Sequence, residues 1–423
     1  MKRVFASASV ILATIVGSAP ASAQVALSMP DAVNEALAKN LDLAAEKWNV
    51  SVSETRRITA ALRPNPVLTV SGQTLNVFHL DFNSNSPLGP NQLTVHTDLP
   101  MERGRKREER VALAQADRTQ AELGVRETMR QVIFAVQSAY VDVQQGKLNL
   151  ALALDNQRRL DNLVAINQSR LNSGDLPQVE LDRSKVAALQ AMASVQQGQL
   201  QLDQAKTQLQ FLLGRNAGAN DFDVESSLRR DTVIETPAEI RNLAMQRRPD
   251  VRLATERQAR TTADLRLQVA NGKVDYVIGT EYVQQAAYGV TGPTMGFSLS
   301  VPLALFNKNQ GEIARAERER SQADARIGAL RASVGAEVEK AYRQYSVSKQ
   351  MLESIEGNML ERARSVRDTT EYAYQRGEAS LIEFLDAQRA FSEATQTYND
   401  ARAAFARSMY LLDAVSGASV NVS

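Results

Sequence analysis

The chain repeats itself at a spacing of roughly half its length. Residues 137–147 have a counterpart at residues 339–349, and residues 170–175 have one at residues 374–378. Solenoids and propellers repeat at a much shorter period of about 20–50 residues. The sequence therefore predicts one structural unit that is present in two copies, not an array of small repeats.

Composition narrows the function classes. Only 5% of the 423 residues are aromatic and the mean hydropathy is −0.30, which favours long solvated helices over a deep globular interior. The 49 basic and 48 acidic residues nearly balance, so nothing points to a nucleic-acid partner.

Catalytic and metal-binding signals are equally sparse. Cysteine is absent, and the histidines are His79 and His96, so neither a thiolate nucleophile nor a histidine-rich metal site is expected. The sequence has no glycine-rich phosphate loop and no catalytic constellation. We therefore expect a protein that is not an enzyme and uses no cofactor.

The N-terminus has the pattern of an export signal. Lys2 and Arg3 precede the apolar residues 4–16, and small residues at 21–23 provide a cleavage site. This pattern predicts a signal peptide over residues 1–23, cleaved after Ala23. A membrane anchor is the alternative, and the short apolar stretch followed by a cleavage site disfavours it.

The two predicted units are residues 24–214 and residues 238–416. Each unit is predicted to contain a helix, a β-hairpin and a coiled-coil hairpin, in that order. In the first unit we expect these at residues 31–62, 67–99 and 103–213. In the second unit we expect them at residues 238–270, 275–301 and 311–414. Between the units lies a linker, 215–237, with a short strand at 232–234, and the tail is 417–423.

Hydrophobic periodicity supports these elements. Alternating apolar residues predict strands with one apolar face, as at Leu93, Val95, Thr97 and Leu99, and a turn is expected at residues 289–293. The long helices instead have apolar residues at spacings of four and three, typical of coiled coils. This stripe includes Val132, Val136, Ala139, Val143 and Leu160 in the first unit, and Val334, Val338, Ala341, Tyr345 and Leu352 in the second.

Strands of about ten residues have the length of tilted transmembrane β-strands. Four strands per chain are too few for a barrel, because known single-chain barrels have about eight or more. Three chains would supply about twelve strands, so we expect a barrel shared across a homotrimer. A helix of roughly 70 residues is about 100 Å long, which suits a helical tunnel attached to that barrel.

Several motifs resemble the TolC-like outer membrane efflux proteins, and the likeness covers almost the whole chain after residue 23. It rests on the duplicated unit, on residues 248–251 and on the turn between Tyr374 and Gly377. Residues 64–66, 99–106 and 301–311 are most similar to the CzcC-like heavy-metal-efflux subgroup.

The resemblance implies a mainly α-helical fold with a small β part, forming a trimeric α-helical tunnel and an outer membrane barrel. It also implies a periplasmic adaptor, an inner-membrane pump of the RND type and outer membrane lipid as partners. The implied function is a passive exit duct, opened at its periplasmic end by adaptor and pump, for heavy-metal cations.

The same resemblance assigns roles to the two hairpin turns. Adaptor docking is expected at the exposed tips, formed by Arg170, Leu171, Gly174, Asp175, Arg376, Gly377, Glu378 and Ala379. A periplasmic gate is expected at Tyr374, Glu383, Asp386 and Glu180. Clustered carboxylates in a constriction would favour cations. The simpler alternative is that these residues cap and pack helices, because Ser380 and Glu383 have the spacing of a capping box.

Other polar residues receive a plainer interpretation. His79 and His96 lie in or near the strands and are expected to be solvated or lumen-facing, not metal ligands. Arg103, Arg105 and Lys106 follow a strand and are expected on a solvated periplasmic face.

Two other functions are open to this sequence. One is a channel of the same fold for type I secretion or for efflux of organic compounds. The other is a periplasmic coiled-coil adaptor or scaffold, but such a protein would have one helical hairpin, whereas this chain has two.

Overall fold

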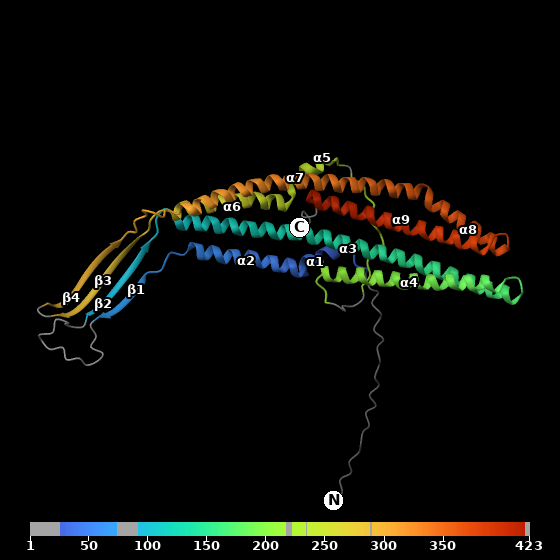
Figure 1. The fold of residues 1–423 in the computed structure, drawn as a ribbon, viewed down its shortest axis with the longest axis horizontal. Coiled ribbons are helices and arrows are strands. Elements are labelled where there is room, and N and C mark those ends of the chain that lie inside the picture. The colour runs from blue at the N-terminus through green and yellow to red at the C-terminus, as the bar shows by residue number, and fades with distance from the viewer. Residues whose placement is uncertain (1–25, 74–91, 217–221, 234, 288–289, 419–423) are drawn as a thin grey trace, which may run out of the picture.

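A computed structural model describes residues 26–73, 92–216, 222–233, 235–287 and 290–418. The predicted signal peptide and His79 lie outside the described residues. The molecule is elongated, with a sheet at one end and two helical hairpin turns at the other (Figure 1). The short helices α1 and α5 lie near its middle.

The order of elements repeats, which confirms the predicted mainly α-helical fold with a small sheet built from a duplicated unit. The first unit comprises α1 Met29–Lys39, α2 Leu41–Ala61, β1 Val67–Gln73, β2 Gln92–Met101, α3 Lys106–Asn172 and α4 Gln178–Leu212. The second comprises α5 Pro237–Arg247, α6 Pro249–Asn271, β3 Tyr276–Ala287, β4 Val290–Ser300, α7 Gln310–Ser354, a π-helical turn η1 Ile355–Met359, α8 Leu360–Arg376 and α9 Leu381–Ser416.

The single helices predicted at residues 31–62 and 238–270 are wrong, because each is broken into two. Asn40 ends α1 and caps α2: its side-chain oxygen accepts from the Leu43 amide at 3.0 Å, and its amide group donates to the Leu212 carbonyl at 3.0 Å. Arg248 has an extended conformation, as a residue before proline prefers, and Pro249 then starts α6.

Two other local predictions also need correction. Residues 232 and 233 form no strand, since the Val233 amide donates to the Tyr345 hydroxyl at 3.0 Å instead of joining a ladder. Residues 290–293, predicted as part of a turn, belong to β4, which pairs with β3 as far as Ala287 and Val290.

The four strands form one antiparallel sheet in the order β1-β2-β3-β4. Residues that pair across neighbouring strands point to the same face of the sheet. This register confirms the predicted alternation of apolar and polar residues. One face is largely apolar and carries Leu68, Val70, Leu93, Val95, Leu99, Ile278, Tyr282, Met295, Phe297 and Leu299. The other face is largely polar and includes Thr69, Ser71, Thr94, His96, Asp98, Glu281 and Ser298.

The helices form a curved layer in which α3 is central. On the sheet side, α3 packs between α2 and α6, and α6 packs on α7. On the turn side, α3 packs between α4 and α9, and α9 packs on α8. The predicted stripes are buried where these helices meet, which confirms their coiled-coil packing. Within the described residues, no helix has both the length and the apolar character needed to cross a membrane.

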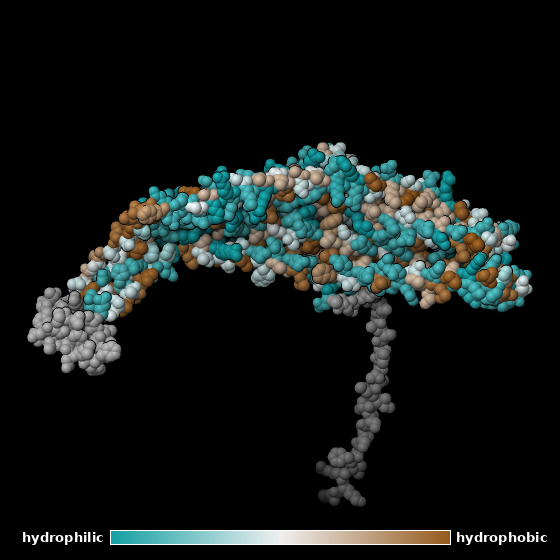
Figure 2. Space-filling model, in the orientation of Figure 1, coloured by the Kyte–Doolittle hydropathy of each residue, from teal (hydrophilic) through white to brown (hydrophobic). Residues whose placement is uncertain are grey.

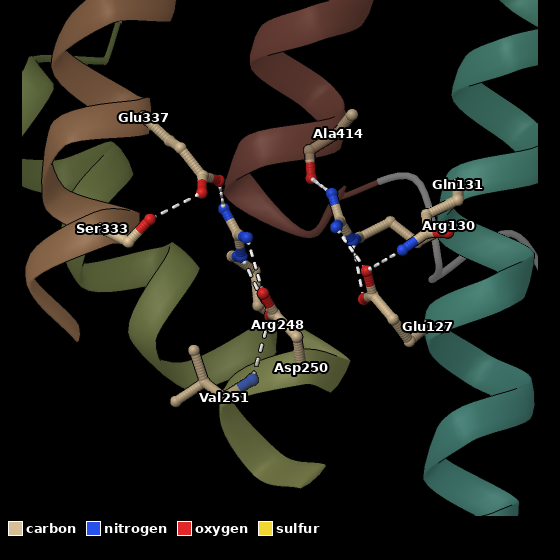
Figure 3. A network of polar contacts seen from close by, with 9 residues as sticks. All are labelled: Glu127, Arg130, Gln131, Arg248, Asp250, Val251, Ser333, Glu337 and Ala414. Atoms are coloured by element: carbon tan, nitrogen blue, oxygen red, sulfur yellow. Dashed lines mark hydrogen bonds and ion pairs between the residues drawn. The ribbon is translucent and has the colours of Figure 1, made fainter. Parts of the chain in front are cut away.

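A buried arginine links three elements near the middle of the molecule (Figure 3). The Arg248 side chain is 2% exposed and binds Asp250 at 2.6 Å and Glu337 of α7 at 2.7 Å. Burial raises the pKa of Asp250. Hydrogen bonding to Arg248 and the charges of Arg248 and Arg130 lower this pKa by more than burial raises it, so it lies below its ordinary value. This network fixes the break between α5 and α6 against α7.

Replacing Arg248 with methionine should destabilise the fold. The change leaves Asp250 and Glu337 without their shared cation, and breaking a buried pair costs about 3 kcal/mol, the low end of the usual range because Glu337 is 44% exposed. The midpoint of thermal unfolding, followed by circular dichroism, should fall. Arg252→Met, which removes an exposed arginine of the same helix, is the control.

The same network predicts a pH dependence. Because the folded pKa of Asp250 is lowered, its stabilising contribution is present above the unfolded pKa of about 3.9 and is lost as pH falls through the folded value. The difference in unfolding free energy between the wild type and Asp250→Asn should therefore shrink below about pH 4.

Equal melting points for Arg248→Met and Arg252→Met would contradict the stabilising role of the Arg248 network.

Candidate functional site

The two helical hairpins end in turns of the same design. Gly174 and Gly377 have φ angles of +83° and +79°, the left-handed conformation that favours glycine at the end of a helix. The amide after each glycine closes the turn: Asp175 donates to the Arg170 carbonyl at 2.8 Å, and Glu378 donates to the Ala373 carbonyl at 2.9 Å. The turns are thus repeat-equivalent, and they lie at the same end of the molecule (Figure 1).

The structure brings the predicted tip residues together at this end. Gly174, Asp175, Arg376, Gly377 and Glu378 are exposed, and Arg170, Leu171 and Ala379 are half-buried. The exposed side chains of Asp175, Arg376 and Glu378 place negative and positive charges on two adjoining turns. Such a surface can bind a partner protein, but Arg170 has an internal role as well.

Tyr374 joins the two hairpins behind the turns. Its side chain is 4% exposed, its hydroxyl donates to the Asn167 side-chain oxygen of α3 at 2.6 Å, and its ring stacks on Phe384 of α9 at 5.6 Å. Arg170 covers the ring at 5.5 Å and donates to the Tyr374 carbonyl at 3.4 Å. A small apolar cluster surrounds the contact and includes Leu160, Leu163, Ala191 and Leu381.

A series of polar contacts continues this link along α3 and α9. Gln388 donates to Asn156 at 3.0 Å, Asn399 donates to Asn149 at 3.1 Å, and Gln145 donates to Asp400. Beside them lies a groove of about 750 Å³ between α3, α4 and α9, lined by glutamine, asparagine and serine side chains together with alanine and leucine. Polar contacts of this kind hold two helices in register with less apolar burial than a leucine seam provides.

The predicted gate carboxylates differ in their surroundings. Glu383 accepts hydrogen bonds from the Ser380 amide at 2.7 Å and hydroxyl at 2.9 Å, in a complete capping box, and these bonds lower its pKa. Asp386 is exposed, one turn further along α9, and makes no hydrogen bond or ion pair within the described chain. Glu180, the repeat counterpart of Glu383, is half-buried at the start of α4. Of the three carboxylates, Asp386 alone is both exposed and without a side-chain partner among the described residues.

Two residues of this site were not predicted from the sequence. Asn167 is 0% exposed and Phe384 is 3% exposed, and both complete the environment of Tyr374. A buried asparagine within a long helix is a usable signal, since such residues need hydrogen-bond partners. Its partner could not be identified, because Tyr374 is distant in the chain.

Metal-binding groups do not gather in the part of the chain that the structure describes. Within those residues there is no group of three or more histidine, cysteine, aspartate or glutamate side chains placed to hold an ion. His96 is half-buried on the polar face of the sheet, 2.9 Å from Asp98.

Comparison with known proteins now adds to this geometry. The model of the family "Outer membrane efflux protein" matches residues 32–215 and 240–418. The chain belongs to this family. Each of the two matched segments contains one helical hairpin and half of the sheet.

Individual relatives of the family are distant in sequence but alike in fold. The chain is 22% identical to the cobalt-zinc-cadmium resistance protein CzcC of Cupriavidus metallidurans, over 90% of this chain and 87% of that protein. It is 22% identical to nodulation protein T of Rhizobium leguminosarum bv. trifolii, over 85% of this chain and 79% of that protein. A crystal structure of CusC has a TM-score of 0.75 at 17% identity, covering 93% of both chains.

Removing the Tyr374 hydroxyl should loosen the link between the hairpins of this efflux protein. In Tyr374→Phe the buried Asn167 oxygen loses its donor, which costs about 1–3 kcal/mol. Amide hydrogen exchange around the turn between α8 and α9 should speed up by about tenfold. Tyr372→Phe, at an exposed tyrosine of the same helix, is the control, and equal protection in the two variants would contradict the proposed link.

Proposed function

We propose that three copies of this chain form a passive exit duct in the outer membrane, as part of a tripartite efflux system. The observation that carries the proposal is that, within the described residues, both the sheet and the helical layer have edges without a partner. In the sheet these are β1 and β4, the first and last strands of an open order. An open sheet edge is not tolerated in lipid, so further copies must close it.

The helical edges support the same assembly. One edge, formed by α2 and α4, exposes Trp48, Val52, Ile58, Val179, Val186, Leu189, Met192 and Leu200. The opposite edge, formed by α7, η1 and α8, exposes Val347, Met351, Met359, Val366 and Tyr372. Val179 and Val186 are seven residues apart, the spacing of a coiled-coil seam. Each edge can pack against the opposite edge of a neighbouring copy.

Closure by three copies gives a barrel of about twelve strands, an even number within the known range. The apolar face of the sheet would then face lipid, and the polar face, with His96 and Glu281, would line the lumen. The helices would extend from the barrel into the periplasm as a tunnel. This location requires export, which the predicted signal peptide with cleavage after Ala23 would provide.

The periplasmic aperture lies, in this proposal, at the hairpin turns. Tyr374 holds the hairpin of α8 and α9 against α3, and Asp386 supplies an exposed charge from each copy. Glu383 and Glu180 would add to an acidic ring, although Glu383 also caps its helix. Opening is a shift between two arrangements of the hairpins, biased by whatever binds one arrangement better.

The gate proposal predicts that Asp386→Asn reduces the preference of the open channel for cations. The attraction between a carboxylate and a permeating cation 4 Å away in water is about 1 kcal/mol. Without this attraction the cation-to-anion permeability ratio should fall by about two- to fivefold. The measurement is reversal potential in planar bilayers under a salt gradient. Asp161→Asn, at an exposed aspartate of α3, is the control. A ratio unchanged by Asp386→Asn would remove Asp386 from the gate.

The exposed turns are proposed to bind a periplasmic adaptor, which couples the duct to an inner-membrane pump of the RND type. Glu378→Lys reverses a charge at the centre of this surface, and we expect adaptor affinity to fall by about tenfold, or 1.4 kcal/mol. Crosslinking and surface plasmon resonance measure the effect. Glu361→Lys, an exposed position on α8 away from the turn, is the control. Full adaptor binding by both Glu378→Lys and Gly377→Ala would place docking elsewhere.

Heavy-metal cations are the proposed substrates, supported by the similarity to CzcC over 90% of this chain. No pocket for an ion is required, because a duct passes what the pump delivers. Sensitivity of a deletion strain to cobalt, zinc and cadmium salts distinguishes this substrate from organic compounds or secreted protein.

A further inference from the structure

Apolar residues follow β4 in the chain beyond the end of the strand. Met295, Phe297 and Leu299 lie on the apolar face of β4, and the chain then continues outside the strand with Val301, Leu303, Leu305 and Phe306. Leu303 is 78% exposed, Leu305 is 71% exposed and Phe306 is 90% exposed. Figure 2 shows hydrophobic atoms along the sheet and at its junction with the helices. Large apolar groups are therefore exposed on a segment that pairs with no strand among the described residues.

Three segments meet at this junction and bring basic residues beside the apolar ones. A Cβ atom added at Gly104 would lie 2.5 Å from the Lys273 side chain, and one added at Gly272 would lie 2.6 Å from the Lys308 carbonyl oxygen. The segments after β2, before β3 and after β4 are thus in close contact. Arg105, Lys273 and Lys308 are all exposed there.

Two acidic groups of the junction, Glu102 and Asp275, are paired with other cations. Asp275 accepts from the Lys106 side chain at 2.6 Å and from the Arg103 amide at 2.8 Å, and Glu102 is paired with Arg110. Across the described parts of the chain, the side chains of Arg105, Lys273 and Lys308 have no ion pair. The junction therefore presents three exposed cations that are available to an anion, with Glu108 and Glu109 of α3 as the nearby carboxylates that have no ion pair in the described residues.

Arg105 occupies a backbone conformation that arginine seldom adopts. Its φ angle is +61°, and its counterpart in the second unit is Asn309, with φ +64°. Asparagine tolerates this left-handed conformation better than arginine does. Keeping arginine at this position points to a use for its charge.

We propose that this junction surface, formed by Leu303, Leu305, Phe306, Arg105, Lys273 and Lys308, binds an anionic phospholipid in the leaflet that faces the helices. The apolar side chains contact the acyl chains, and the cations contact the phosphate. The apolar part of the surface lies on the segment that directly follows β4, and the charge of the surface is complementary to that headgroup. The inference rests on the proposed function, which places the sheet in the outer membrane.

The test uses the purified assembly in vesicles of phosphatidylcholine, with or without phosphatidylglycerol. Phe306→Trp in a Trp48→Phe background gives a single fluorescent reporter, because Trp48 is the one tryptophan of the chain. Brominated phosphatidylglycerol should quench this reporter more strongly than brominated phosphatidylcholine at equal mole fraction. A reporter at the hairpin tips, Tyr372→Trp in the same background, should not be quenched by either lipid.

Removing charge should weaken the preference for phosphatidylglycerol. One cation near an anionic membrane surface is worth about fivefold in binding, so Lys273→Gln with Lys308→Gln should lower the preference by about 25-fold. The matched control removes two exposed cations elsewhere, Lys340→Gln with Arg362→Gln. Wild-type conductance in the junction variant would show that it still folds and assembles.

The outcomes separate this inference from the proposed function. Equal quenching by both lipids in a conducting assembly would overturn headgroup recognition, and so would a preference that survives loss of Lys273 and Lys308. No quenching at residue 306 would also overturn it, because a neighbouring copy would then cover Phe306. Absence of conductance from the wild type would instead contradict the proposed function.

Discussion

The outer edges of β1 and β4 carry backbone amides and carbonyls that no described strand of the same chain pairs. In water such an edge is tolerable, but in lipid each unpaired group costs several kcal/mol. The same incompleteness recurs in the helices, where α2 and α4 form one apolar edge and α7 and α8 form the other. One chain is thus a curved segment with open edges, and the proposed trimer is what would close them.

Duplication supplies a nearly symmetric segment, and the departures from symmetry fall at the turns. Gly174 and Gly377 are equivalent, yet Leu171 is replaced by Tyr374, whose hydroxyl reaches Asn167 on the other hairpin. The start of α9 has a capping box that the start of α4 lacks. The second hairpin is therefore attached to the first by the Tyr374–Asn167 hydrogen bond. In the proposed mechanism, a shift of the hairpins breaks this bond.

Sequence periodicity predicted the elements whose pattern is sustained over many residues. Strand faces such as Leu93 to Leu99 and the buried stripes of the long helices followed from their spacings, because side-chain direction is fixed by backbone geometry. The breaks at Asn40 and Arg248 were missed although each has a local signal, a capping asparagine and a following proline; the contacts that fix them, with Leu212 and Glu337, required the packed structure. Tyr374 and Asp386 were predicted as site residues through the family resemblance; the Asn167 partner required the packed structure.

The mass of the assembly extracted from the outer membrane tests the central claim most directly. Native mass spectrometry of the purified protein, in a detergent that preserves membrane assemblies, reports the number of chains in each particle. Closure of the open edges by neighbouring copies predicts particles of three chains, with single chains a minor species. A stable single chain that spans the membrane, or an assembly of a different number of chains, would contradict the account.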